Sequence, residues 1–293
     1  MVLQPKVVFL DMDGTILNHQ NKVTLKTVEA IERVRKSGVK VAIATGRSYG
    51  EVEEILPPNL VVDGIISSNG MSVHIGKDRL VENTLPIDLV NLIIEKAREK
   101  QVYYEVFPTE GPRVTLVEDR PFMEREVDGE KPDDVVISEW LSRKEAIDRD
   151  IEWKVTLDSD KFSKFYFFSR TKDKINAWKD ELEQIKKSIN FTTSISSEHN
   201  VEVMVANVNK ASGIQYLLDR FGVHKSEVLA IGDSDNDFPM FKLVGHSVAM
   251  KNASDRVKQV VDEVTEYTCD EDGVYHYLGR KIAFREGNEK GSQ

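Results

Sequence analysis

The stretch VVFLDMDGTIL, residues 7–17, decides the fold of this chain. Four apolar residues run directly into Asp11, Met12 and Asp13, and a Gly-Thr pair follows. A short, continuously apolar run is typical of a strand in a sheet that is covered on both faces. Because buried charge is costly without a partner, a positive group should meet the two carboxylates. The sequence therefore predicts a first strand that ends in a functional site.

The composition limits the kinds of partner. The chain has 293 residues, of which 40% are hydrophobic and 31% charged, as is ordinary for a globular protein with a sizeable core. Forty basic and fifty acidic residues give a net charge of −10, which argues against nucleic acid or an anionic membrane as a partner. The single cysteine, Cys269, cannot form an internal disulfide, and this fits a reducing compartment.

Two further features concern membranes and targeting. Asp11 interrupts the N-terminal apolar run, which favours a first strand over a signal peptide. Nowhere do about eighteen apolar residues stand together, so no membrane span is expected. We therefore expect a soluble, cytoplasmic protein, and the oligomeric state is left open.

The first and last thirds of the chain share one pattern, in which apolar strands alternate with amphipathic helices. This pattern predicts a parallel sheet covered by helices, a Rossmann-like α/β core. We expect it to resume near Val201, and only the final Glu286–Gln293 looks frayed. The expected strands are Val7–Leu10, Val39–Ala44, Gly64–Ser67, Val228–Ile231 and Ser247–Met250, and the expected helices are Lys26–Lys36, Tyr49–Leu56, Ala211–Phe221, Pro239–Leu243 and Ala253–Val261.

The middle third has a different, α+β character. Half-buried strands are expected at Val102–Phe107, Arg113–Val117, Lys164–Phe168 and Phe191–Ile195, with helices at Ile87–Lys100 and Asp173–Lys187 and a charged segment from about Asp119 to Asp150. We therefore predict two domains. The core consists of residues 1–84 and 199–293, and residues 85–198 form a smaller domain inserted into it.

Polar clusters follow four of the predicted core strands. They are Asp11–Thr15, Thr45-Gly46, Ser68-Asn69 and Gly232–Asp237. In open parallel sheets, ligands bind beyond the carboxyl ends of the strands, so neighbouring strands would bring these clusters to one place.

Four carboxylates would then meet, those of Asp11, Asp13, Asp233 and Asp237. Such a set favours a hard divalent cation, and Mg²⁺ prefers a few carboxylates plus waters and a substrate phosphate. A calcium loop beginning at Asp233 is not supported, because Phe238 and Val244 stand where that loop needs glycine and glutamate.

Five ordered motifs now support a family resemblance. DMDGT, ATGR, SSNG, NKASGI and GDSDNDFPM occur in that order and cover nearly the whole chain. The set resembles the haloacid dehalogenase-like phosphatase superfamily. The insert of about 110 residues is similar to the α/β cap of the C2B type that Cof-type members carry. The resemblance implies a Mg²⁺-dependent phosphatase that works through an aspartyl-phosphate.

The resemblance also implies roles for individual residues. Asp11 would be the nucleophile and Asp13 the general acid and base. Thr45 and Lys210 would bind the phosphoryl group, and Asp233 would complete the magnesium site with Asp11 and the backbone carbonyl of Asp13.

Chemistry supports several further assignments. Backbone amides near Met12 and Asp13 can cradle phosphate oxygens, and Thr45-Gly46 precedes a helix and suits an anion. Asn236 could also contact phosphate, while Asp237 would orient Lys210 or metal-bound water. Two roles stay open for Arg47, reaching the substrate or bracing the acidic cluster.

The expected substrate is a small phosphorylated metabolite. Sugar phosphates come first, with pyridoxal phosphate or flavin mononucleotide as further candidates. Two alternatives are a phosphomutase of the same superfamily and a non-catalytic sensor of a phosphorylated metabolite. No motif marks the residues that set specificity, and Glu105, Arg113, Glu118 and Arg120 are polar candidates in the insert.

Overall fold

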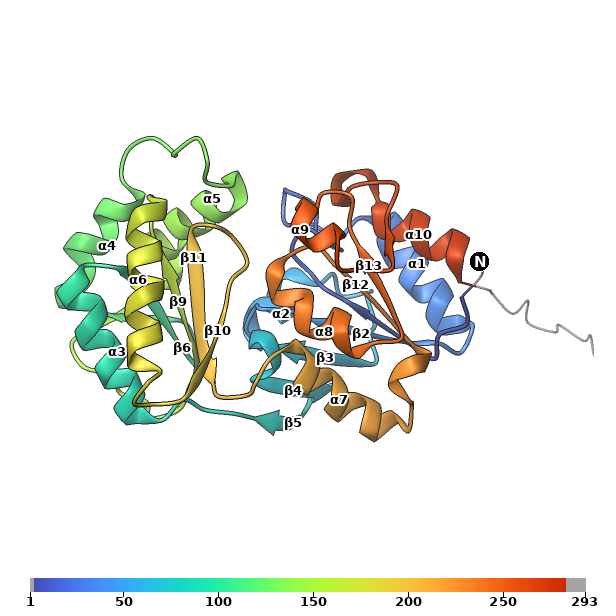
Figure 1. Cartoon of the computed structure of the whole chain (residues 1–293), viewed down its shortest axis with the longest axis horizontal. Helices are drawn as coiled ribbons and strands as arrows, with labels where there is room; N and C mark the ends of the chain where they lie inside the picture. The colour runs from blue at the N-terminus through green and yellow to red at the C-terminus, as the bar shows by residue number, and fades with distance from the viewer. Residues whose placement is uncertain (1–2, 283–293) are drawn as a thin grey trace, which may run out of the picture.

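The computed structural model describes residues 3–282 and arranges them in two lobes, each built on one sheet (Figure 1). The predicted fraying of Glu286–Gln293 lies outside the described residues. The first lobe contains strands β1 (Val7–Leu10), β2 (Lys40–Ala44), β3 (Gly64–Ser67), β4 (Ser72–Ile75), β5 (Asp78–Glu82), β12 (Val228–Gly232), β13 (His246–Ala249) and β14 (Glu263–Val264), with helices α1 (Leu25–Lys36), α2 (Tyr49–Ile55), α7 (Lys210–Phe221), α8 (Phe238–Leu243), α9 (Asp255–Lys258) and α10 (Gly273–Lys281).

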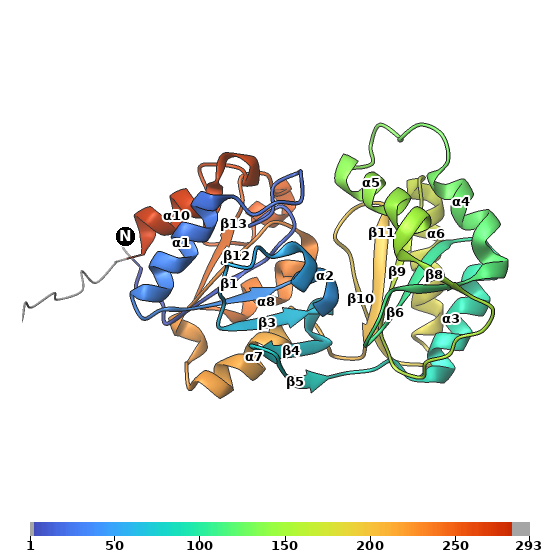
Figure 2. The same ribbon diagram turned by 180° about the vertical axis from the view of Figure 1, so that it is seen from behind.

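The sheet of the first lobe has the order β14-β13-β12-β1-β2-β3-β4-β5, and it is parallel from β14 to β3. The predicted parallel α/β core is thus confirmed. Helices cover both faces of strand β1. Val8 and Leu10 pack with α1 and α10, while Val7 and Phe9 pack with α7 and α8. Seen from behind, α1 and α10 lie side by side on one face (Figure 2). A strand covered on both faces has to be apolar throughout.

Three strands of this sheet, β4, β5 and the two-residue β14, were not predicted. β4 and β5 follow the SSNG motif as an antiparallel extension at the sheet edge. Their sequence, SVHIGKDRLVE, mixes charged and apolar residues, because an edge hairpin is only partly buried.

The second lobe contains strands β6 (Tyr103–Pro108), β7 (Val114–Leu116), β8 (Glu152–Lys154), β9 (Phe162–Phe168), β10 (Phe191–Ser194) and β11 (Asn200–Val205), and helices α3 (Ile87–Lys100), α4 (Arg120–Val127), α5 (Ile137–Glu145) and α6 (Lys172–Ile185). Its sheet has the order β10-β11-β9-β6-β7-β8 and is mostly antiparallel. Helices α4 and α5 and strand β8 fall within or next to the charged segment, where no element was predicted.

The second sheet has one apolar and one polar face. Aligned residues such as Val106, Phe165 and Val203 belong to the hydrophobic core of this lobe. Side chains alternate along each strand, so the residues between them, Glu105, Tyr166 and Glu202 in register, lie on the opposite face. Figure 1 shows α3 and α6 on the outer side of the sheet, and the opposite face is turned toward the first lobe.

Strand β11 corrects one boundary. The core pattern was predicted to resume at residue 199, near Val201, but β11 pairs antiparallel with β9 and β10 of the second sheet. Its run VEVMV reads equally well as a strand of either sheet, since both faces are buried. The chain therefore returns to the first lobe only after Val205.

Two connections, residues 83–86 and 206–209, join the lobes. Met71 packs against Met204 and Val208, and the backbone amide of Asn83 donates to the Met71 carbonyl oxygen at 2.7 Å. This cluster holds both connections next to each other.

Two helices of the last third differ from the prediction. The helix expected over Ala253–Val261 is limited to α9, one turn at Asp255–Lys258. Helix α10 was not predicted, although Val274, Tyr277 and Leu278 bury one of its faces. Among residues 3–282, no helix has both the length and the apolar character needed to cross a membrane.

Candidate active site

The four polar clusters meet at one edge of the first sheet. Strands β12, β1, β2 and β3 are consecutive neighbours, so Asp233, Asp11, Thr45 and Asn69 follow adjacent, parallel strand ends. The predicted convergence is therefore confirmed. It arises from topology, because parallel strands place all their carboxyl ends on the same side.

Lys210 supplies the positive charge that the first strand requires. It is the first residue of α7, and Asn209 caps that helix by accepting from the Ser212 amide. The Lys210 Nζ lies 2.6 Å from Asp11 Oδ1 and 2.6 Å from Asp237 Oδ1, and its side chain is 0% exposed. These two carboxylates raise the pKa of Lys210 above its ordinary value, although burial opposes the shift. The lysine is therefore held charged beside Asp11.

Asp237 contacts Lys210 and two backbone amides. Its Oδ1 accepts from Lys210, and its Oδ2 accepts from the backbone amides of Asp233 and Ser234 at 2.9 and 3.1 Å. Both oxygens are thus engaged. The structure thus places Asp237 next to Lys210, and its predicted role in orienting that lysine stays a prediction.

Asp233 carries an oxygen without a partner. Its Oδ1 is buried and has no hydrogen-bond partner within residues 3–282. Burial and the nearby Asp11 carboxylate raise the pKa of Asp233 well above its usual range, and burial raises that of Asp11 to about 7. Gly14, at φ +70°, leaves room for this carboxylate, since a Cβ there would lie 2.2 Å from Asp233 Oδ2.

The carboxylates of Asp11 and Asp233 fit a divalent cation. Oxygens of Asp11, Asp233 and Asp237 all lie within 4.8 Å of one another. Because Asp237 is already engaged, Asp11 and the unpartnered Asp233 oxygen are the groups suited to ligate a hard ion. Burial is the main cause that raises both pKa values, and a cation there would favour the charged form of both carboxylates.

The Arg47 guanidinium pairs with the Asp13 carboxylate, so Arg47 contacts the acidic cluster in this structure. Its Nε lies 2.9 Å from Asp13 Oδ2, and its Nη2 lies 2.5 Å from Asp13 Oδ1. The two carboxylates of the DMD motif therefore differ: Asp11 is buried beside Lys210, whereas the Asp13 side chain is 53% exposed beside an arginine.

The remaining predicted residues surround this centre. Thr45 is fully buried, and its Oγ1 accepts from the Arg47 amide at 3.2 Å. Gly46 and Asn236 line the cavity beside Asp11. The side chain of Met12 instead packs into the core, so only its backbone is available to a ligand.

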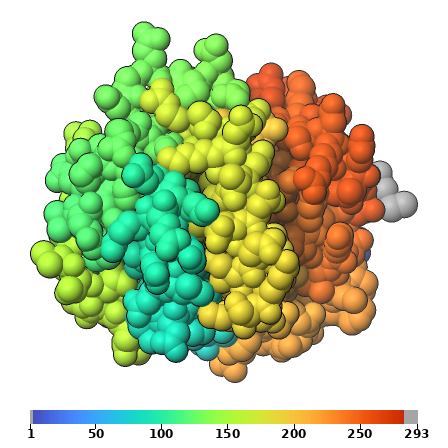
Figure 3. Space-filling view, turned by 60° about the vertical axis from the view of Figure 1, so that its left-hand side comes forward, coloured from blue at the N-terminus to red at the C-terminus, as the bar shows by residue number. Residues whose placement is uncertain are grey.

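A cavity of about 340 Å³ extends from this centre to the polar face of the second lobe. Figure 3 shows the second lobe, coloured cyan to yellow, lying directly against the orange part of the first. No sequence motif identified the residues of the second lobe that line the cavity, which include Phe107, Glu139, Ser142, Arg143, Lys164, Tyr166, Asn200 and Glu202.

The polar candidates named from the sequence do not line this cavity. Glu105 is fully buried and accepts from Arg113 Nη1 at 2.8 Å. Glu118 and Arg120 pair with Arg98 and Glu124 at the surface of the lobe.

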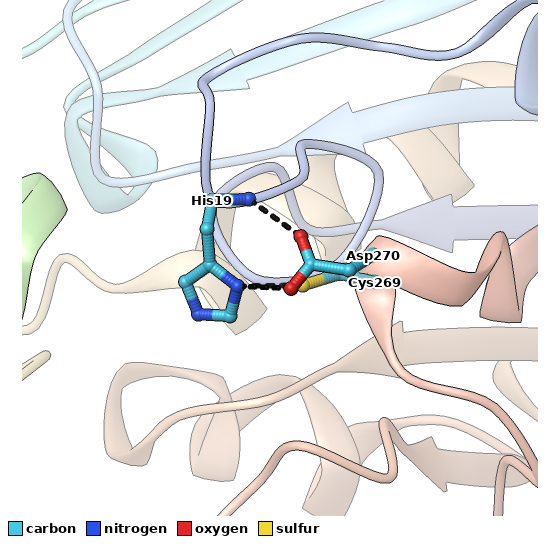
Figure 4. A group of neighbouring side chains, drawn as sticks. All are labelled: His19, Cys269 and Asp270. Atoms are coloured by element: carbon cyan, nitrogen blue, oxygen red, sulfur yellow. Dashed lines mark hydrogen bonds and ion pairs between the residues drawn. The ribbon is translucent and has the colours of Figure 1, made fainter.

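A separate group of side chains lies beside the cavity, which His19 also lines. It consists of His19, Cys269 and Asp270 (Figure 4). Asp270 accepts from the His19 amide at 3.0 Å, and His19 Nδ1 lies 2.5 Å from Asp270 Oδ2. Burial raises the pKa of the Cys269 thiol to about 11, so the thiol is protonated and a poor nucleophile at neutral pH. The group fastens the loop after β1 to the segment before α10.

Comparison with known proteins agrees with the geometry. A family model described as haloacid dehalogenase-like hydrolase matches residues 8–278. The chain is 29% identical over 288 residues to the Bacillus subtilis 5-amino-6-(5-phospho-D-ribitylamino)uracil phosphatase YwtE, covering 95% of this chain and 98% of that protein. It is 28% identical to the B. subtilis phosphatase YwpJ, over 93% and 98% of the two chains. A solved haloacid dehalogenase-like hydrolase from B. subtilis superposes with a TM-score of 0.80 at 26% identity, over 94% and 100%.

Proposed function

The chain belongs to the haloacid dehalogenase-like hydrolase family, and we propose that it is a Mg²⁺-dependent phosphatase that hydrolyses small phosphomonoesters through an aspartyl-phosphate on Asp11. One observation carries the proposal. A fully buried lysine, Lys210, lies 2.6 Å from Asp11, beside a carboxylate of Asp233 whose buried oxygen has no partner within residues 3–282.

Electrostatics is the main obstacle to this reaction. A carboxylate attacking a phosphate dianion at about 4 Å meets roughly 8 kcal/mol of repulsion at an effective dielectric constant of about 20. Lys210 offsets part of this repulsion, because its charge is fixed next to the attacking oxygen. A divalent cation held by Asp11, Asp233 and the backbone carbonyl of Asp13 would supply further positive charge to the phosphoryl oxygens.

Asp13 is the proposed general acid and base. It is placed two residues after Asp11, and it is paired with Arg47 in this structure, so this pair has to open before Asp13 can carry a proton to the leaving group. In the first step the phosphorus–oxygen bond to the leaving group breaks, a bond to Asp11 forms, and Asp13 gives its proton to the leaving alkoxide. In the second step water attacks phosphorus, Asp13 accepts its proton, and Asp11 is released with inorganic phosphate.

The size of the cavity favours a small substrate. About 340 Å³ accommodates a phosphoryl group with a leaving group of metabolite size. Sugar phosphates and the phosphates of cofactors such as pyridoxal or flavin are the proposed class. A phosphorylated ribitylaminouracil is a second candidate, because the phosphatase YwtE, named for that substrate, aligns with 95% of this chain.

The test measures phosphate release from p-nitrophenyl phosphate and from a panel of phosphorylated metabolites. We expect turnover with Mg²⁺ and none after chelation, and loss of turnover in Asp11→Asn. The exposed Asp219→Asn on α7 is a matched control. Full activity of Asp11→Asn would contradict the assignment of the nucleophile. Inorganic phosphate released in less than stoichiometric amount would favour a phosphomutase, and binding without turnover would favour a sensor.

A further inference from the structure

Two charged side chains of α5 each carry a buried polar atom that has no hydrogen-bond partner within the described part of the chain. These atoms are Glu139 Oε2 and Arg143 Nε. Both residues line the active-site cavity, and α5 lies on the side of the second lobe that faces the first (Figure 1). Being four residues apart, the two side chains share one face of the helix. Buried polar atoms are nearly always paired, so these two point to a ligand that supplies the partners.

The rest of the Glu139 carboxylate is fixed by its neighbours. Its Oε1 accepts from the Tyr166 hydroxyl at 2.6 Å, from Asn200 Nδ2 at 2.8 Å and from Ser197 Oγ at 3.0 Å. With three donors on one oxygen, the carboxylate cannot turn without breaking them. The second oxygen is therefore oriented in advance as an acceptor.

Arg143 is held just as firmly. Its Nη1 donates to Glu105 Oε1 at 2.5 Å and its Nη2 donates to Ser142 Oγ at 2.8 Å, while its guanidinium stacks over the Tyr166 ring at 4.1 Å. The side chain is 8% exposed. Its charge is countered by Glu105, which also pairs with Arg113, and by the nearby Glu139 carboxylate, so the free Nε–H is a directional donor more than a site for an anion.

We propose that Glu139 and Arg143 bind hydroxyl groups of the leaving group, so that the preferred substrates are phosphates of sugars or sugar alcohols. This inference rests on the proposed phosphatase function. A hydroxyl both donates and accepts, and a vicinal diol therefore satisfies Glu139 Oε2 and Arg143 Nε together. An alkyl or unsubstituted aromatic leaving group would leave both buried atoms unpaired, which is costly.

The experiment compares two substrates that share a primary alkoxide leaving group. Ribose 5-phosphate carries hydroxyl groups, and n-pentyl phosphate carries none. We expect kcat/KM for ribose 5-phosphate to exceed that for n-pentyl phosphate by at least tenfold in the wild type. Glu139→Gln replaces the free acceptor with a donor, and Arg143→Lys removes the Nε donor. Each should reduce this ratio about tenfold, chiefly through KM.

A matched control and the contrary outcomes complete the test. Glu145→Gln lies on the same helix but is exposed and pairs only loosely with Arg149, 3.7 Å away, so it should leave the ratio unchanged. A wild-type ratio near one, or equal loss on both substrates in Glu139→Gln, would overturn the inference while leaving the phosphatase proposal intact. Absence of phosphate release from either substrate and from p-nitrophenyl phosphate would overturn the phosphatase proposal, and the inference with it.

Discussion

The buried ion pair between Lys164 of β9 and Glu202 of β11 lies on the face of the second lobe that is turned toward the first, and it gives a sharp test of this geometry. Lys164 Nζ lies 2.5 Å from Glu202 Oε1 and 2.5 Å from the Gly46 carbonyl oxygen of the first lobe. The two side chains are only 4% and 6% exposed. Unit charges about 4 Å apart interact by ~4 kcal/mol at a dielectric constant of about 20. Removing one partner of a buried pair typically costs ~3–5 kcal/mol.

We therefore expect Lys164→Met to lower the free energy of unfolding by about 3–5 kcal/mol, because Glu202 would stay buried without its cation. Methionine keeps most of the length of the lysine side chain, but it loses the contact between Nζ and the Phe107 ring, whose centre lies 4.6 Å away. Urea unfolding, followed by tryptophan fluorescence and circular dichroism, measures the loss. Lys161→Met, an exposed lysine just before β9, is the control and should change stability by less than about 0.5 kcal/mol.

A double variant separates the pair from its surroundings. Lys164→Met with Glu202→Gln removes both charges, so we expect it to recover at least half of the loss. If the two single losses simply add in the double variant, the charges do not interact in solution. The reasoning from this buried pair would then be refuted.

Three further predictions concern single groups. Burial, with a smaller contribution from Arg79, lowers the pKa of His74 to about 4, below the unfolded value of about 6.5. The neutral imidazole therefore contributes its full stabilisation above pH 6.5, and this contribution is lost as the pH falls toward 4. Between pH 7.5 and 5 the wild type should lose about 1–2 kcal/mol more unfolding free energy than His74→Phe, a variant that keeps the stack on Tyr49. Equal losses in the two proteins would contradict this prediction. Because its pKa is raised, the Cys269 thiol should react with a disulfide reagent at pH 8 at least about a hundredfold more slowly in the folded protein than in the protein unfolded by guanidinium. Rapid labelling of the folded protein would count against a buried thiol. Lys210→Met should lower kcat about a thousandfold, since ~4 kcal/mol of charge stabilisation at Asp11 is lost, and a change confined to KM would contradict the role given to this lysine.

The catalytic edge of the first sheet could be predicted because its cause is local. Apolar strands that run directly into polar motifs identify both the parallel sheet and the edge at which ligands bind. The charge that such a strand leaves unbalanced predicted a positive partner, and the family resemblance indicated Lys210 as a residue of this site. The five motifs give the order of these residues along the chain, and the parallel topology brings the strand ends together.

The second lobe could not be predicted to the same depth. Its site residues occupy alternate positions of strands whose other face is the lobe's core, so Lys164 and Tyr166 look like ordinary strand residues in the sequence. Glu139 and Arg143 fall in a charged segment, where solvent exposure is the usual explanation. Which of these side chains enter the cavity depends on how the second sheet is turned toward the first, and no local pattern records that orientation.

The paired connections between the lobes limit how the molecule can open. Because Met71, Met204 and Val208 hold the two connections next to each other, we expect any opening of the molecule to be a rotation of the second lobe about this cluster. Each swing would carry α5 back to the same position above Asp11. Recognition of the leaving group would then be reproduced at every turnover, and a proteolytic cut in either connection would impair selectivity before it impaired the chemistry.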